Sequence, residues 1–500
     1  MRFITDLLAY ATGVPESTLR LLLTIILAYP VAKIYNDTYG RTSTKTAADR
    51  NAYVLLTGLG LAFFFNGFSI IHSLITVSVS YGMCYAADQV NNRRLAVAGV
   101  WVFNALYLLL GYYYMASEEY DISWTMPQCI LCLRLMGFSF DFLDGAQSIK
   151  MAGPEKAKND TEVREGVVRP TADKRSPSSL PLSFDVDTPL RQLPAFQEVM
   201  AYCYFPSAFL VGPQFSFSLY RKWLNRAMYT RKSVDLEEQQ EKAQITYVWR
   251  SVALAFIYLS LQQTVGASYP TSYLTTDAFA ALPFYKRMFI FMLSGKFVFN
   301  KYLGVWLLTE GACAYFGITY MGDNEEGYSL YGGLANALPG RYETATSIDH
   351  VIASFNVNTN YWVKYYVFKR LKFLGNKQIS QFAALAFLAI WHGFHPMYFV
   401  TFFMEFLTTI CEKILRQRVV PLIQPYLQRN EVATYAWKFA AWLACFFTTS
   451  YCVIGFDMLL VGKSLRAYSN VWFIGHLIFA AIVAANHFIP KRRVIGKKTM

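Results

Sequence analysis

Two histidines lie in the middle of a long apolar run, where an ionisable side chain is costly. The run extends over about 379–410 and contains the sequence Trp391-His-Gly-Phe-His-Pro396. His392 lies roughly 20 Å along a helix from the polar edge of the run at Ile379, well inside an apolar membrane layer of about 30 Å. Because ionisable groups at such a depth generally mark a functional site, the histidines predict proton transfer to or from a reacting group.

The two histidines can have different roles. A neutral imidazole in a desolvated site can act as a general base, and the alternative for His392 is a histidine that is hydrogen-bonded to a neighbouring helix. His395 follows three residues later and can share one helix face with it. The sequence does not support a metal site, because a histidine pair needs a further ligand and the nearest acid, Glu405, lies well beyond His395.

A block of alternating asparagines precedes the histidines. Asn356, Asn358 and Asn360 are followed by aromatic residues and lysines. Amide side chains near membrane depth can hydrogen-bond a polar ligand or a developing oxyanion. The alternative is a polar loop at the membrane surface with an asparagine helix cap. The residue types alone leave both interpretations open.

The elements that must position these residues are membrane segments. The chain is 54% hydrophobic and only 16% charged, with a mean hydropathy of +0.26, whereas soluble proteins average about 25% charged residues. This composition predicts an all-α, polytopic integral membrane protein with about ten to twelve membrane helices or re-entrant segments. Gly393 and Pro396 can break the helix at the histidines, so the 379–410 segment is expected either to re-enter the membrane or to cross it as a tilted helix.

The chain is expected to form one membrane domain over 1–500, because no internal repeat is evident. A segment at about 146–195 is rich in Lys, Glu, Asp, Ser and Pro, which predicts a solvated polar loop between two membrane portions. Cys129 and Cys132 lie in an apolar run without a second pair at zinc-site spacing, so they are expected to be core residues.

The net charge of +13 is concentrated in three basic clusters, at 221–232, 364–377 and 491–498. Positive residues beside membrane segments favour the cytosolic side, which predicts a basic cytosolic tail at 490–500. Contact with an anionic ligand is compatible with that topology. Nothing in the sequence resembles a nucleic-acid-binding module.

The histidine and asparagine motifs, in this order, resemble a known family. Trp391-His-Gly-Phe-His-Pro396, preceded by Phe355-Asn-Val-Asn-Thr-Asn-Tyr-Trp362, is similar to the membrane-bound O-acyltransferase family, and within it to the branch that acylates lysophospholipids. The resemblance extends from about residue 15 to the C-terminus. Three further stretches carry it, at 137–145, 204–215 and 368–375.

The resemblance implies roles for single residues. The buried catalytic histidine of the family matches His392, and its partner asparagine matches Asn356. Further substrate-contacting residues are expected from the rest of the motifs and, for coenzyme A phosphates, from nearby positive charge; they are Asn358, Asn360, Trp391, His395, Lys369, Arg370 and Lys372.

The resemblance also implies an activity and a location. It implies transfer of a fatty acyl group, expected to be polyunsaturated, from acyl-coenzyme A to the sn-2 hydroxyl of lysophosphatidylcholine and related lysophospholipids, in a chamber enclosed by the membrane helices. The expected partners are acyl-coenzyme A, the lysophospholipid and membrane lipids, with no permanently bound cofactor, no metal and no nucleic acid; a homodimer is left open. Lys497-Lys-Thr-Met500 resembles a dilysine retrieval signal, which implies an endoplasmic reticulum membrane protein with a cytosolic C-terminus.

Two alternatives remain at this point. One is a family relative that acylates another lipid or a protein, which a panel of acceptors would distinguish. The other is a proton-coupled transporter, in which His392, Asp141, Asp144 and Glu310 act as relay groups. That alternative requires proton-linked flux in liposomes without release of coenzyme A.

Overall fold

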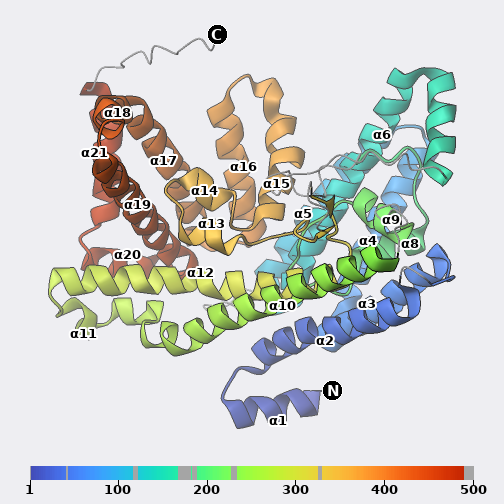
Figure 1. The fold of residues 1–500 in the computed structure, drawn as a ribbon, viewed down its shortest axis with the longest axis horizontal. Coiled ribbons are helices and arrows are strands. Elements are labelled where there is room, and N and C mark those ends of the chain that lie inside the picture. The colour runs from blue at the N-terminus through green and yellow to red at the C-terminus, as the bar shows by residue number, and fades with distance from the viewer. Residues whose placement is uncertain are drawn as a thin grey trace.

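The computed structural model describes residues 2–40, 43–115, 122–166, 182, 188–226, 234–324 and 329–488. The described chain is almost entirely α-helical (Figure 1), which confirms the all-α prediction. The backbone of the predicted polar loop at about 146–195 is helical as far as Gly166, and 167–181 and 183–187 of it lie outside the described residues. The predicted basic tail at 490–500 also lies outside them.

The first part of the chain forms long helices that lead into two short ones. These elements are α1 (Arg2–Thr12), α2 (Glu16–Tyr39), α3 (Ala47–Asn66), the 3-10 helix η1 (Gly67–Ser69), α4 (Ile70–Gln89), α5 (Arg93–Met115), α6 (Thr125–Gly166), α8 (Phe196–Cys203) and α9 (Phe217–Leu224).

The middle of the chain contains two long helices and several short elements. These elements are α10 (Val234–Thr264), η2 (Gly266–Ser268), η3 (Thr271–Thr275), α11 (Asp277–Ala280), α12 (Phe284–Tyr315), the antiparallel pair β1 (Gly322–Asp323) and β2 (Ser329–Leu330), α13 (Pro339–Glu343), α14 (Ile348–Ile352), α15 (Val357–Tyr366) and η4 (Phe368–Leu374). The last part contains α16 (Lys377–His392), α17 (Pro396–Arg418), α18 (Val420–Leu427), α19 (Glu431–Met458), α20 (Val461–Asn470) and α21 (Ile474–Phe488).

Several helices are long and apolar enough to span a membrane. Among the described residues, four helical segments are long and apolar enough to cross a membrane: Glu16–Tyr39, Ala47–Gln89, Arg93–Met115 and Glu431–Met458. The bent pair Val461–Asn470 and Ile474–Asn486 adds a fifth if it is counted as one span. Other apolar stretches of the sequence form shorter or more charged helices, such as the 16-residue α16. The protein is therefore a multi-pass membrane protein.

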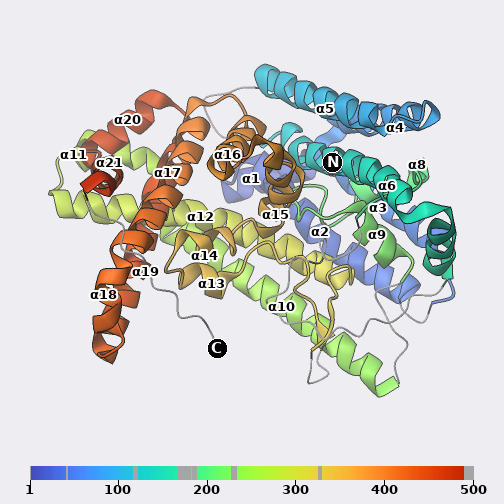
Figure 2. The ribbon, with the colours of Figure 1, turned by 90° about the horizontal axis from the view of Figure 1, so that it is seen from above.

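Helix α12 links the N-terminal helices to the C-terminal ones. It runs beside α10 and contacts both α2 and α19 (Figure 1). Close helix contacts need small residues, and Gly311 lies against Tyr29 of α2 while Gly295 lies against Ser450 of α19. Seen from above, α15 and α16 lie next to the middle of α12 (Figure 2), where the candidate site is found.

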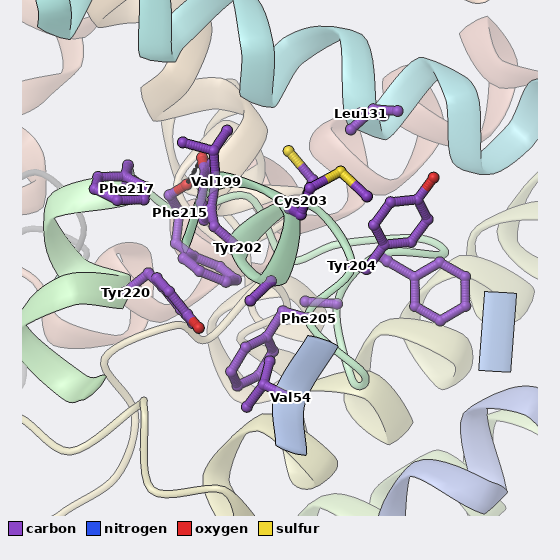
Figure 3. Packing of buried hydrophobic residues seen from close by; sticks show 14 of the residues in the cluster. Val54, Leu131, Val199, Tyr202, Cys203, Tyr204, Phe205, Phe215, Phe217 and Tyr220 are labelled. Carbon is purple, nitrogen blue, oxygen red and sulfur yellow. Dashed lines mark hydrogen bonds between the residues drawn. The ribbon is translucent and has the colours of Figure 1, made fainter. Parts of the chain in front are cut away.

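A buried arginine organises the connection between α8 and α9. Arg134 of α6 is 1% exposed. Its guanidinium donates to the carbonyl oxygens of Tyr202, Cys203 and Ala208 at 2.7–3.1 Å, and it lies 4.7 Å from the centre of the Phe215 ring. The apolar side chains of this connection pack together in the largest described core cluster (Figure 3).

Gly58 lets α3 approach the same connection. A methyl group on its Cα would lie 1.8 Å from the carbonyl oxygen of Tyr204, which no backbone packing tolerates without movement. On the same helix, a methyl group at Gly60 would meet open space. Gly58 therefore serves a contact that Gly60 does not.

We expect Gly58→Ala to lower the melting temperature of the purified protein, because overpacking costs about 1–3 kcal/mol. Gly60→Ala is the matched control: it should leave stability unchanged or raise it by up to about 1 kcal/mol, because alanine has the higher helix propensity. Thermal unfolding in detergent, followed by intrinsic fluorescence, measures both. Equal melting temperatures for the two variants would contradict the close approach of α3.

Candidate active site

The helix breaks at the histidines. Helix α16 ends with His392, and α17 begins with Pro396 at its first position, where proline lacks only a hydrogen bond that the helix would not make. Gly393 between them has φ +123°, a conformation that side-chain-bearing residues rarely adopt. Helices α16 and α17 then contact each other. The predicted break at Gly393 and Pro396 is confirmed, and the segment is a helical hairpin rather than one straight helix.

His392 lies among aromatic rings with its nitrogens uncommitted. Four ring centroids lie 4.7–5.5 Å from the imidazole centroid: those of Trp391, Tyr398, Phe402 and Phe456. Within the part of the chain that the structure describes, neither ring nitrogen of His392 is hydrogen-bonded. The predicted alternative of a histidine bonded to a neighbouring helix is thus not what the described residues form. Both nitrogens are available to a ligand.

Asn356 lies at the beginning of α15 in an unusual conformation. Its φ of 49° and ψ of 44° are left-handed, which asparagine tolerates better than most residues. It occupies the N-cap position, yet its side chain makes no cap hydrogen bond. Its Oδ1 instead accepts a hydrogen bond from Nδ2 of Asn336 at 3.3 Å. The amide is therefore directed by tertiary contacts and not by the helix that it precedes.

The other two asparagines of the block hold the backbone. Nδ2 of Asn358, which is fully buried, donates to the carbonyl oxygens of Leu334 and Ala335 at 3.0 and 3.1 Å. Nδ2 of Asn360 donates to the carbonyl oxygens of Ile352 and Phe355 at 2.9 and 2.8 Å. These bonds hold two stretches of backbone that precede Asn356, so among the described residues Asn356 is the asparagine of this block whose NH₂ group has no partner.

Two cavities meet at His392 and Asn356. The larger has a volume of about 330 Å³ and the smaller about 210 Å³. Both are lined by the same five residues, and each then continues along different elements: the larger past α5, α6 and the α8–α9 connection, the smaller past α14, α17 and α19. The five shared residues are Tyr302, Trp306, Asn356, Thr359 and His392.

The remaining motif residues are placed differently. Trp391 is buried, and its indole N–H donates to the carbonyl oxygen of Cys129 at 3.0 Å, which fixes α16 against α6. Trp391 and His395 line the larger cavity only. Cys129 and Cys132 are both free cysteines. Cys132 is buried in the core, as predicted, whereas Cys129 is half-buried against that core and lines the larger cavity.

The three basic candidates for substrate contact lie on η4, away from both cavities. The side-chain ammonium of Lys369 lies 3.5 Å from the centre of the Tyr365 ring. Arg370 forms an ion pair with Asp144, and Lys372 is exposed. None of the three lines either cavity as far as the described chain extends.

The acids of the relay alternative do not form a chain to His392. Asp141 accepts a hydrogen bond from the Tyr366 hydroxyl at 2.8 Å, and Asp144 is paired with Arg370. Glu310 accepts hydrogen bonds from the Tyr247 hydroxyl and from the Asn336 backbone. Each carboxylate thus has partners of its own, and none of them lines the cavities around His392 in the described residues.

Several residues of the site were not predicted from the sequence. Tyr302 and Trp306 lie one turn apart on α12 and line both cavities. Their only signal in the sequence was helical spacing within an apolar, aromatic stretch, which equally describes core residues. Asn336 had none, because it is a single amide in an irregular segment.

Comparison with known proteins agrees with this geometry. The sequence model of MBOAT, the membrane-bound O-acyltransferase family, matches residues 109–456, which include His392, Asn356 and both cavities' shared lining. Lysophospholipid acyltransferase 5 of Drosophila melanogaster is 37% identical over 423 residues, covering 84% of this chain and 76% of that protein.

More distant relatives cover nearly the whole length. Lysophospholipid acyltransferase 5 of Homo sapiens is 32% identical over 504 residues, covering 99% of this chain and 93% of that protein. A lysophospholipid acyltransferase of Saccharomyces cerevisiae is 24% identical over 497 residues, covering 94% of this chain and 74% of that protein. With a family match over most of its length and relatives above 30% identity, this chain belongs to the membrane-bound O-acyltransferase family.

Proposed function

We propose that this protein is a lysophospholipid O-acyltransferase, which transfers a fatty acyl group from acyl-coenzyme A to the sn-2 hydroxyl of lysophosphatidylcholine and related lysophospholipids. The observation that carries the proposal is the junction of two cavities at His392 and Asn356. Acyl transfer between two lipids needs one point where two bulky substrates meet beside a base. The names of the relatives support the choice of a lysophospholipid as the acceptor.

His392 is the general base of the proposed reaction. A ring nitrogen takes the proton of the acceptor hydroxyl while the hydroxyl oxygen attacks the thioester carbonyl carbon, which forms the new C–O bond. The tetrahedral intermediate then expels the coenzyme A sulfur as the C–S bond breaks, and the imidazolium returns its proton to the thiolate. Proton transfer of this kind contributes roughly 10²–10⁴-fold to a rate.

Asn356 stabilises the negative charge that develops on the carbonyl oxygen. Its Oδ1 is bonded to Asn336, but its NH₂ group has no partner among the described residues, so that group can donate to the oxyanion. The side chains packed around His392 are aromatic, so substrates that fill the two cavities displace water from an apolar wall. Exclusion of water by the bound substrates strengthens this hydrogen bond and protects the thioester from hydrolysis.

The finer features of the proposal rest on the sequence. A preference for polyunsaturated acyl chains follows from the family resemblance. Contact of Lys369, Arg370 and Lys372 with coenzyme A phosphates is inferred from their positive charge. An endoplasmic reticulum location with a cytosolic C-terminus is inferred from the basic, dilysine-like end of the sequence. Arg370 is paired with Asp144, whereas Lys372 is exposed, so Lys372 is the better placed of these two residues to contact a phosphate. No described cavity reaches this helix, so the contact requires a path outside the two cavities.

A matrix of acyl-coenzyme A donors and lysolipid acceptors tests the proposal on the purified full-length protein. We expect the phosphatidylcholine product, detected by mass spectrometry, with a 1-acyl acceptor, and release of the new acyl chain by phospholipase A2. Sterol, diacylglycerol and peptide acceptors serve as comparisons. Preferential acylation of one of these, or proton-linked flux in liposomes without coenzyme A release, would contradict the proposal.

A further inference from the structure

The orientation of the Asn356 amide is set by a buried residue outside the motifs. Asn336 lies between β2 and α13 and is 2% exposed. Its Oδ1 accepts the backbone N–H of Asn358 at 3.0 Å, and its Nδ2 donates to Oδ1 of Asn356 at 3.3 Å. Its backbone carbonyl also accepts the N–H of Val357 at 3.1 Å. Asn336 thus contacts three successive residues at the beginning of α15.

The direction of each bond follows from one fixed donor. A backbone N–H can only donate, so the N–H of Asn358 requires an oxygen on Asn336. The amide of Asn336 must then turn its NH₂ group toward Asn356. That donor requires an oxygen in turn, so Asn356 presents Oδ1 to Asn336 and leaves its own NH₂ group for the junction of the cavities.

Glu310 holds Asn336 from the other side. This carboxylate on α12 is 2% exposed and accepts the backbone N–H of Asn336 at 3.1 Å, together with the hydroxyl of Tyr247. A carboxylate accepts hydrogen bonds and so suits two donors that would otherwise be buried without partners. Glu310 lies one turn beyond Trp306 on α12. The same helix therefore both lines the junction and supports Asn336.

We propose that Asn336, held by Glu310, is a positioning residue that makes Asn356 a hydrogen-bond donor toward the substrate. The inference rests on the proposed acyl transfer and specifies it: the group opposite Asn356 is an acceptor, as the thioester carbonyl oxygen and the oxyanion are. A donor such as the free hydroxyl of the acceptor lipid is not the partner of Asn356.

Asn336→Asp tests this by reversing one bond. Aspartate still accepts the N–H of Asn358, but it offers a second oxygen to Asn356, which must then turn its NH₂ group away from the substrate. We expect kcat to fall by roughly 10²–10³-fold, as for loss of an oxyanion donor, with KM for both substrates unchanged. Asn336→Ala leaves the amide free to take either orientation, so it should lower kcat less, by about 5-fold, the worth of one hydrogen bond.

A double-mutant cycle distinguishes positioning from a purely structural effect. In an Asn356→Ala background, Asn336→Asp should lower kcat no further, because the amide that it orients is absent. Asn104→Asp is the matched control: Asn104 is fully buried, and its Nδ2 likewise donates, to Ser80 and Val100, but it lines neither cavity. Its kcat per folded molecule should equal that of the wild type.

The outcomes separate the two proposals. No acyl transfer by the wild-type protein with any lysophospholipid overturns the proposed function. If the wild type is active and Asn336→Asp keeps the full kcat, the positioning role alone is overturned. The same holds if the effects of the Asn336 and Asn356 substitutions on kcat are independent and multiply. If Asn336→Asp yields no folded protein, Asn336→Ala decides by the same cycle.

Discussion

His392→Ala should lose roughly 10²–10⁴-fold in turnover of acyl-coenzyme A and lysophosphatidylcholine, the usual contribution of a general base. The imidazole lines both cavities at their junction, and the side chains packed around it are aromatic rings that offer no second base. The loss should appear in kcat, because the substrates are bound mainly by the walls of the cavities. Single-turnover measurements with labelled acyl donor give the residual rate.

His476→Ala is the matched control for this experiment. His476 contacts a different part of the fold, where its Nδ1 lies 2.7 Å from the hydroxyl of Tyr451. Its substitution should change stability but leave turnover per folded molecule unchanged. Full turnover by His392→Ala, at a melting temperature equal to that of the wild type, would remove His392 from the mechanism. His395→Ala should fall between the two, because His395 lines one cavity only.

Local features of the site were predictable from the sequence. The break at the histidines follows from Gly393 and Pro396, whose backbone restrictions act within a few residues, but the sequence left a hairpin and a tilted helix as alternatives. The prediction that His392 lies in an apolar environment follows equally from its neighbours in the chain. Both rest on interactions of short range, which the order of residues expresses directly.

The difference among the three asparagines was not predictable. Their alternation suggests equivalent roles, but Nδ2 of Asn358 and Nδ2 of Asn360 donate to backbone carbonyls, whereas Asn356 bonds through Oδ1 to Asn336. Asn336 also bonds to Asn358, and it lies in the irregular segment before α13, away from the block in the sequence. Contacts of this kind depend on how separate segments pack, and they cannot be predicted from residue type alone.

For the basic cluster around η4, the sequence predicted a contact that the structure does not show. Positive charge predicts contact with phosphate, yet the guanidinium of Arg370 is bound to Asp144 of α6 and the ammonium of Lys369 lies over the Tyr365 ring. Charge in a sequence shows what a side chain can bind. The fold decides which partner it meets first.

Arg134→Met should abolish the folded protein or lower its melting temperature more than any other substitution considered. Methionine has a similar length and suits an apolar interior, so the change removes little packing. It does remove the donors for the carbonyl oxygens of Tyr202, Cys203 and Ala208. The carbonyl of Tyr202 still accepts the backbone N–H of Phe205, but those of Cys203 and Ala208 lose the donors that the structure shows for them. Each buried acceptor left without a donor costs about 1–3 kcal/mol, a large part of a total stability of about 5–15 kcal/mol.

The positive charge of Arg134 is not enough to hold the α8–α9 connection, because the shape of the guanidinium also matters. Arg134→Lys tests this. An ammonium is a point charge that cannot reach acceptors on both sides as the planar guanidinium does, so lysine should recover only part of the stability. Arg429→Met is the control on an exposed arginine, where about ±0.5 kcal/mol is expected. Thermal unfolding in detergent compares the three variants. If Arg134→Met has the same melting temperature as Arg429→Met, the α8–α9 connection is held by its apolar contacts. If its melting temperature is far lower, the guanidinium holds the connection. The wall that this connection gives the larger cavity then depends on one buried cation.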